Sequence, residues 1–166
     1  MTSYDPSEMR PEWLISSGVY VVTLQAEDRV NGYSAGWVTR ISEVPVIVQV
    51  AVWERNYSYE LAQDAQHFAV HILEDGQQGM ARHFGQTSGR AMDKLSSYET
   101  RPGGSGTPIL LDCLAHLECA IIFRRIFGDH TILVGEVIQS EIHRNGIPLI
   151  HNYADYHTPC QQMRSE

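Results

Sequence analysis

A histidine stands where chemistry is most plausible in this sequence. His130 comes directly after the pair Gly128-Asp129 and directly before a long apolar run. An imidazole changes its charge near neutral pH, so this residue could serve as a general base, a metal ligand or a cofactor contact. A polar side chain that only closes a turn is the plain alternative. The residue alone leaves all four interpretations open.

Two other stretches have a composition that could hold a ligand. Residues 33–42, YSAGWVTRIS, combine hydroxyl side chains with small residues that let a planar ligand approach the backbone N–H groups. An edge strand with its hydroxyls turned to water is the alternative, and composition alone favours it. Residues 53–58, WERNYS, place Arg55, Asn56 and Ser58 at an expected helix N-terminus, which suits a phosphate. A solvated turn explains this second stretch equally well.

Other motifs point away from metal and nucleotide chemistry. Cys113, His116 and Cys119 are each three residues apart, but strand alternation sends His116 and Cys119 to opposite faces. Zinc needs ligands that converge on one point, so no metal site is predicted. His67 and His71 have the spacing of helix-borne ligands, yet they lie in an expected strand. The Walker A, GxGxxG, HExxH, CxxC and GxSxG motifs are absent.

Length and charge set further limits. The 166 residues are expected to form one domain over 1–166. The net charge is -8 and Lys94 is the single lysine, so neither nucleic acid nor an anionic membrane is an expected partner. Three cysteines are too few and odd in number for a disulfide framework, and no apolar run is long enough to span a bilayer. A cytoplasmic protein is therefore predicted.

The elements that must position these residues are mostly strands. Alternating or β-branched stretches predict strands over 18–24, 33–42, 46–52, 67–73, 117–127, 131–142 and 147–151. Tight turns are expected at Asn31-Gly32, Gly128-Asp129 and Asn145-Gly146. Short helices are expected after Ser58 as N-cap and over 77–84, and residues 85–108 are expected to be mostly loop. A closed or half-closed antiparallel barrel would protect the strand edges and place His130 at its rim.

Nine stretches, taken in order, resemble the flavin reductase-like, FMN-binding split-barrel family. They are GVYVVT, NGYSAGWVTRISEVP, VIVQVAV, FAVHIL, MARHFG, MDKL, LECAI, GDHTILVGEV and GIPLIHNYADY, and the resemblance covers about Arg10 to Tyr156. It implies a mainly β fold with short helices, namely an antiparallel, Greek-key-like split barrel. It also implies a homodimer that holds FMN, or sometimes FAD, near the subunit interface.

The resemblance also assigns roles to individual positions. The flavin is expected along Ser34, Ala35, Gly36, Trp37, Val38 and Thr39, with Ser42 just beyond. The phosphate is expected at Arg55, Asn56 and Ser58, with nearby contacts from Ala81, Arg82 and Phe84. His130 is expected to face the flavin or the nicotinamide, and residues 151–156 are expected close to the site.

The expected activity is hydride transfer from NADH or NADPH to the bound flavin, because the cofactor carries the chemistry and the protein orients it. A monooxygenase that takes up the reduced flavin is an expected partner, and another electron acceptor is the alternative. A second hypothesis is an electron-transfer flavoprotein with bound FMN and no nicotinamide site. A third is a haem-binding module with His67, His71 or His151 as axial ligand.

Overall fold

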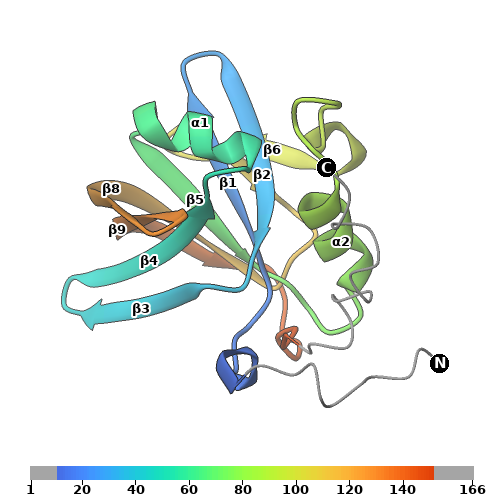
Figure 1. Ribbon diagram of the computed structural model, residues 1–166. Helices are drawn as coiled ribbons and strands as arrows, with labels where there is room; N and C mark the ends of the chain where they lie inside the picture. Colours follow the sequence, from blue (N-terminus) through green and yellow to red (C-terminus); the bar gives the residue numbers. More distant parts are fainter. Residues whose placement is uncertain (1–10, 152–166) are drawn as a thin grey trace.

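The computed structural model describes residues 11–151, which form a mainly β, antiparallel structure with two short α-helices (Figure 1). The large sheet has the strand order β2-β1-β5-β8-β9-β4-β3. Its strands are β1 (Tyr20–Ala26), β2 (Arg29–Ala35), β3 (Val38–Glu43), β4 (Val46–Trp53), β5 (His67–Ile72), β8 (Ala115–Phe127) and β9 (His130–Ile142). The expected fold class is thereby confirmed.

The remaining elements are short. The helices are α1 (Tyr57–Asp64) and α2 (Gln78–Gln86), with 3₁₀ turns at η2 (Pro11–Leu14) and η3 (Leu95–Ser97). A second sheet pairs β6 (Thr100–Pro102) with β7 (Pro108–Leu110). Within residues 11–151, no helix has the length and apolar character needed to cross a membrane.

The large sheet curls so that the end of its edge strand β2 approaches β4, next to the opposite edge. β2 and β3 lie at opposite edges, yet only Gly36 and Trp37 separate them in the chain. At this junction the Tyr33 hydroxyl donates to the Ala51 carbonyl at 3.1 Å, and the Ala51 N–H donates to the Trp37 carbonyl at 3.1 Å. The end of β2 therefore lies against β4, which gives the half-closed barrel a defined rim.

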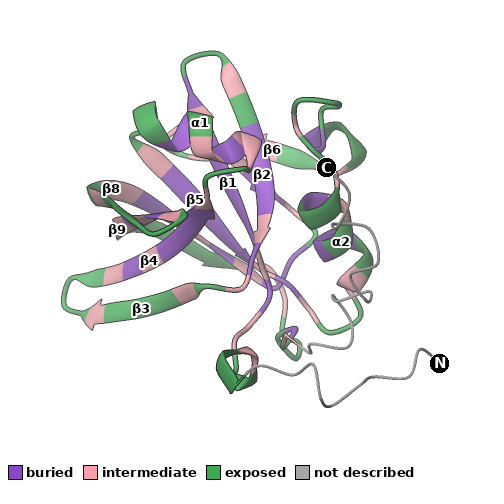
Figure 2. Ribbon diagram, viewed as in Figure 1, coloured by how far each residue is buried: buried purple, intermediate pink, exposed green. Residues whose placement is uncertain are grey.

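Two cores pack on opposite sides of β1, whose successive side chains point to opposite faces. Val22 joins a cluster with Phe68 and the α1 residue Leu61, whereas Val21 joins a cluster with the α2 residue Phe84. In Figure 2 the buried residues accordingly concentrate in β1, β2, β4 and β5, while β3 is largely exposed. The two helices thus cover the part of the sheet that borders the rim.

The first hairpin turns earlier than expected. The β1–β2 register places the tip at Glu27-Asp28, where Glu27 has a φ of 54°, so the expected tip at Asn31-Gly32 is wrong. Asn31 lies within β2, and its amide donates to the Ser58 hydroxyl at 2.8 Å. A Cβ at Gly32 would lie 2.8 Å from the Phe84 ring. The Asn-Gly pair is thus required by helix packing rather than by a turn.

Other expected boundaries also shift. The strand expected over 33–42 is broken at the edge-to-edge junction. Ser58 is the second residue of α1, and Asn56 is its N-cap without a side-chain capping bond, so the expected Ser58 cap is wrong. Part of the expected 85–108 loop forms β6 and the first residue of β7. Residues 147–151 make isolated bridges rather than a strand.

Candidate functional site

Two adjoining hollows lie at the rim, beside the junction of β2 with β4. Both are lined by Tyr33, Ser34, Asn56 and Gly85, so they share a wall and form one continuous depression. Their empty volumes are about 490 and 660 Å³, including space open to solvent. The shape suits an elongated ligand with two chemically different ends.

The first hollow has the character of an anion site. It is lined by Arg55, Asn56 and Ser58 at the start of α1 and by Thr87 and Ser88 after α2. The N-terminus of a helix carries partial positive charge, and its first N–H groups have no partner within the helix. Together with the guanidinium and the hydroxyls, these groups favour a phosphate.

Lys94 also lines the first hollow, although it was not among the expected site residues. It is 4% exposed, and its ammonium donates to the Phe84 carbonyl at 3.0 Å. Burial lowers the pKa of Lys94 to about 8. An ammonium has three N–H donors, so it can bind an anion while it keeps the bond to Phe84.

The second hollow suits a planar ring system. It is lined by Ala35, Gly36 and Trp37 at the end of β2, and by Trp53 and His130 from the opposite side. Because β2 is an edge strand, its outer row of backbone N–H and C=O groups is not paired within the sheet. Small residues leave these groups accessible to a ligand.

His130 opens β9 and pairs with Trp53 of β4. Its Nδ1–H donates to the Asp129 carboxylate at 2.7 Å, which lowers the pKa of Asp129. Its ring centre lies 4.6 Å from that of Trp37. With Nδ1 engaged by Asp129, Nε2 is the nitrogen that can contact a ligand in the second hollow.

Most of the expected site residues come together here. The two hollows include Ser34, Ala35, Gly36, Trp37, Arg55, Asn56, Ser58, Phe84 and His130. Val38 and Thr39 line a third hollow, which adjoins the second at Ser34, Gly36 and Trp37.

Three expected residues lie elsewhere, of which Ala81 is buried in the core cluster that includes Phe84 and lines none of the hollows. Ser42 is paired with Ile47 near the far end of the β3–β4 hairpin, and it lines none of the three hollows. Arg82 is exposed on α2 and lines none of them either. Of residues 151–156, His151 lines the third hollow, and the others lie outside the described residues.

Comparison with known families identifies the family to which this fold belongs. Residues 13–159 match the family described as "Flavin reductase like domain", so the chain belongs to that family. The resemblance noted in the sequence is confirmed.

Three relatives illustrate the range of the family. The diflavin flavoprotein A 1 of Synechocystis is 31% identical over 140 residues, which cover 83% of this chain and 24% of that protein. The ferric-chelate reductase (NAD(P)H) of Archaeoglobus fulgidus is 28% identical, with 86% and 85% covered. The solved NADH:FAD oxidoreductase of Streptomyces globisporus is 30% identical, with 90% and 92% covered and a TM-score of 0.79.

The chain spans about a quarter of the length of the diflavin flavoproteins it matches. Family and relatives together support an oxidoreductase that works with a flavin cofactor.

Proposed function

We propose that this protein is an NAD(P)H:flavin oxidoreductase that binds FMN in the joined hollows, with FAD as the alternative flavin. The observation that carries the proposal is the continuous depression with an anion-binding end and a ring-binding end. FMN has a phosphate at one end and a planar ring system at the other, so its two parts match the two hollows.

Each part of the chain then has a task. Arg55, Lys94 and the start of α1 bind the phosphate, because they bring positive charge to one place. The outer backbone edge at Ala35 and Gly36 donates to the ring system and can stabilise negative charge there without rearranging. When bound, the flavin supplies the capacity to accept a hydride from NADH or NADPH.

His130 is proposed to position the nicotinamide. Asp129 holds its Nδ1–H, which fixes the orientation of the ring and leaves Nε2 for the co-substrate. Its side chain is 20% exposed, so it combines a fixed position with access from solvent. Correct placement of two reactants at close approach can supply a large part of a rate enhancement.

The test is to mix the purified protein with FMN and NADH, or with FMN and NADPH, in air and to follow the nicotinamide absorbance. Rapid loss that depends on the protein is expected with at least one nicotinamide. No loss with either one, despite a bound flavin spectrum, would overturn the reductase assignment.

One observation favours a second candidate, an electron-transfer flavoprotein with bound FMN and no nicotinamide site. The diflavin flavoproteins that the chain matches are about four times its length, so in those proteins the matching region is one part of a larger flavoprotein. A stable flavin that NADH and NADPH leave oxidised, but that dithionite reduces, would support this candidate.

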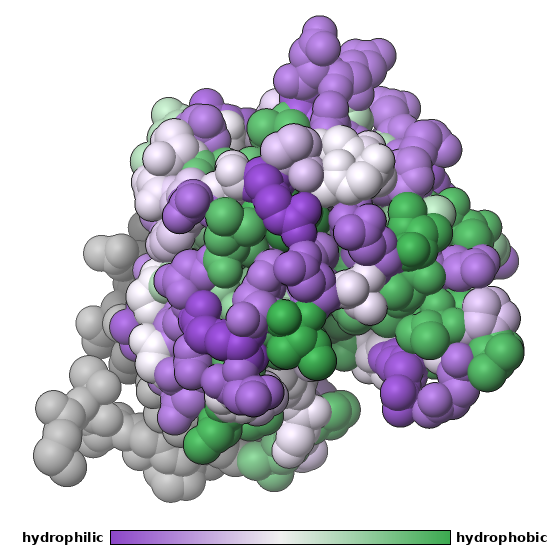
Figure 3. Space-filling view, turned by 180° about the vertical axis from the view of Figure 1, so that it is seen from behind, coloured by the Kyte–Doolittle hydropathy of each residue, from purple (hydrophilic) through white to green (hydrophobic). Residues whose placement is uncertain are grey.

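We also propose that the protein is a homodimer. Six apolar side chains of β8 and β9 are each more than half exposed: Ile122, Phe123, Ile126, Phe127, Ile138 and Ile142. Figure 3 shows apolar side chains gathered on the side of the molecule where these strands lie. Exposed apolar patches of this kind commonly mark protein–protein contacts.

Light scattering on a sizing column tests the homodimer. The wild-type chain is expected at twice the monomer mass, and Ile126→Glu is expected at the monomer mass. Ile147→Glu changes an equally exposed isoleucine outside the patch and should leave the dimer intact. A wild-type monomer would contradict the proposal.

A partner monooxygenase remains a prediction, which product formation by a coupled monooxygenase would test.

A further inference from the structure

A row of polar side chains crosses the sheet far from the rim, running from the buried His71 and His116 to the exposed Glu141. The registers pair His71 of β5 with His116 of β8, and His116 with Glu141 of β9. Residues paired directly across antiparallel strands point to the same face. His143 follows Glu141 by two residues, just beyond the end of β9, and so returns to this face.

His71 lies at the buried end of the row, and both of its ring nitrogens are hydrogen-bonded to the backbone. It is fully buried, its Nδ1–H donates to the Val21 carbonyl at 3.0 Å, and its Nε2 accepts from the Leu110 N–H at 3.0 Å. Both nitrogens are therefore occupied, and His71 cannot serve as a ligand.

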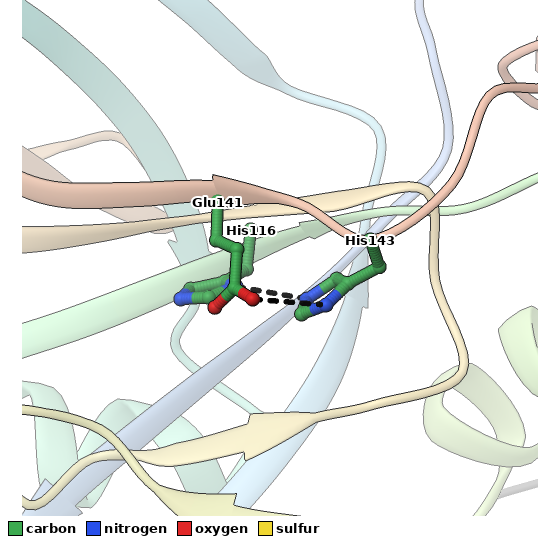
Figure 4. A group of neighbouring side chains, drawn as sticks. All are labelled: His116, Glu141 and His143. Atoms are coloured by element: carbon green, nitrogen blue, oxygen red, sulfur yellow. Dashed lines mark hydrogen bonds and ion pairs between the residues drawn. The ribbon is translucent and has the colours of Figure 1, made fainter.

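The next three side chains converge instead. The His116 Nδ1 lies 2.9 Å from the His143 Nε2, and the His143 Nδ1 lies 4.0 Å from the Glu141 Oε1. One ligand atom from each residue lies within 4.8 Å of the others. Figure 4 shows the His143 ring directed at both His116 and Glu141.

The spacing between the two imidazoles is close to that of a metal site. With zinc–nitrogen bonds of about 2.0–2.1 Å, two nitrogens 2.9 Å apart subtend about 90° at the ion. If the two nitrogens moved apart to about 3.3 Å, they would subtend the tetrahedral angle at the ion. His143 can supply this shift because it lies beyond the end of its strand.

Neighbouring charged groups orient His116 and Glu141 in the way that metal ligands are commonly oriented. The other nitrogen of His116, Nε2, is buried without a hydrogen bond among the described residues, and it lies 3.8 Å from the Glu118 carboxylate. Metal-bound histidines usually direct their second N–H at such a carboxylate. Arg101 binds the Glu141 Oε2 at 2.5 Å, which leaves Oε1 on the side of His143.

Glu118 is itself held in place by hydrogen bonds. It accepts hydrogen bonds from the Gly104 N–H at 3.2 Å, the Ser105 N–H at 3.2 Å and the Ser105 hydroxyl at 3.1 Å. The buried carboxylate is thus ready to accept the N–H of His116.

We propose that His116, His143 and Glu141 bind a divalent transition metal ion, of which Zn²⁺ is the probe of choice, with solvent as the fourth ligand. Two imidazoles and a carboxylate suit Zn²⁺ and its neighbours better than Mg²⁺ or Ca²⁺, which prefer oxygen ligands. Neither cysteine of residues 11–151 takes part, because Cys113 and Cys119 are buried free thiols outside this group.

The metal site is separate from the flavin site. His130 and Glu141 are eleven residues apart on β9, so roughly 35 Å lies between them at the rise of an extended strand. The ion therefore makes no contact with the flavin. It joins the start of β8 to the end of β9 and thereby stabilises this junction.

Calorimetric titration of the chelator-treated protein with Zn²⁺ tests the proposal. One ion per chain is expected, with an affinity at least tenfold weaker in His143→Ala and in Glu141→Gln. Both variants retain buried His116, so they are expected to fold, and circular dichroism checks this. Anomalous scattering at the zinc edge should place the ion between the three side chains.

Two matched variants serve as controls. His67→Ala removes a half-buried histidine of β5, and Glu136→Gln changes a carboxylate of β9 outside the group. Both should bind Zn²⁺ as the wild type does. No stoichiometric binding, or equal binding by all four variants, would overturn the proposal. FMN affinity should be the same in all of them, so this result stands apart from the proposed reductase activity.

Discussion

The two ends of the paired strands β8 and β9 carry histidines in opposite settings: His130 opens β9 at the rim, and His116 lies at the start of β8 at the far end. At the rim, His130 is partly exposed, one of its nitrogens is held by Asp129, and the other is directed to an open depression. At the far end, His116 is fully buried and shares a row with His71, whose nitrogens are both bonded to backbone groups. The same residue type thus lines an open depression at one end and lies inside the sheet at the other.

The difference is whether the polar groups lie at an edge of the sheet or between its central strands. The rim includes the outer edge of β2, so backbone and side-chain donors remain accessible to a ligand. At the far end His71 lies between central strands, where a buried polar group needs a partner within the protein. Substitutions at the rim should therefore change flavin binding, whereas substitution of the fully bonded His71 should change stability.

The largest effect is expected where the two hollows join. Gly85 lines both of them, and a Cβ there would lie 3.3 Å from the Ser34 Cβ. Gly85→Leu would fill the joint, so FMN affinity should fall at least about 100-fold, the loss of some 2.7 kcal/mol. Gly79→Leu is the control on the same helix, because no atom lies within 4 Å of its added Cβ. FMN affinity is measured by titration. Equal affinity in both variants would show that the flavin binds outside this depression.

The next effect concerns the buried row. His71→Leu removes the partners of the Val21 carbonyl and the Leu110 N–H. Two buried groups without partners should lower the free energy of unfolding by about 3 kcal/mol. Urea denaturation measures this loss, and FMN affinity should stay unchanged. His67→Leu, on the same strand but half-buried, should lose far less; equal losses would contradict the special role of the row.

A smaller effect is expected at His130. His130→Ala removes the group proposed to position the nicotinamide, so hydride transfer should slow about 10- to 100-fold. The dissociation constant of FMN should change little, because the phosphate end supplies most of the charged contacts. Asp129→Asn keeps the imidazole but weakens the hydrogen bond that orients it, so this variant should slow the reaction less than His130→Ala. Stopped-flow absorbance measures the rate of flavin reduction. A rate in His130→Ala equal to that of the wild type would contradict the assignment.

The smallest effect is a pH dependence set by Lys94. Burial lowers the pKa of Lys94 to about 8, so the ammonium loses its proton as pH rises through that value. Only the charged form attracts phosphate, and one unit above the pKa about a tenth of it remains. FMN affinity should therefore fall by up to about tenfold between pH 7 and pH 9. Riboflavin, which lacks the phosphate, should bind equally at both values. Lys94→Met should abolish the FMN effect; an unchanged effect would assign it to another group.

Periodicity and the resemblance predicted much of the fold and part of the site. The expected helix over 77–84 lies within one residue of α2 at its start, and it buries Met80, Ala81 and Phe84 as predicted. The strand expected over 67–73 is β5. These elements follow local patterns that packing reinforces. The ordered motifs also identified most residues that line the two hollows.

Other features depend on contacts that no local pattern encodes. Asn31-Gly32 has the composition of a hairpin tip, but packing against Ser58 and Phe84 holds it within a strand. Lys94 reaches the first hollow because residues 87–94 fold back over α2, although its being the only lysine could have drawn attention to it. The meeting of His116 with His143 depends on the β8–β9 register, which bulges shift.

The most direct test of the account is a crystal structure of the protein grown with FMN. We expect density for one FMN per chain, with the phosphate beside Arg55 and Lys94 and the ring system along Ala35 and Gly36, facing His130. Flavin density at another place, or no density in a protein that also fails to bind FMN in solution, would contradict the central claim that the joined hollows form the flavin site.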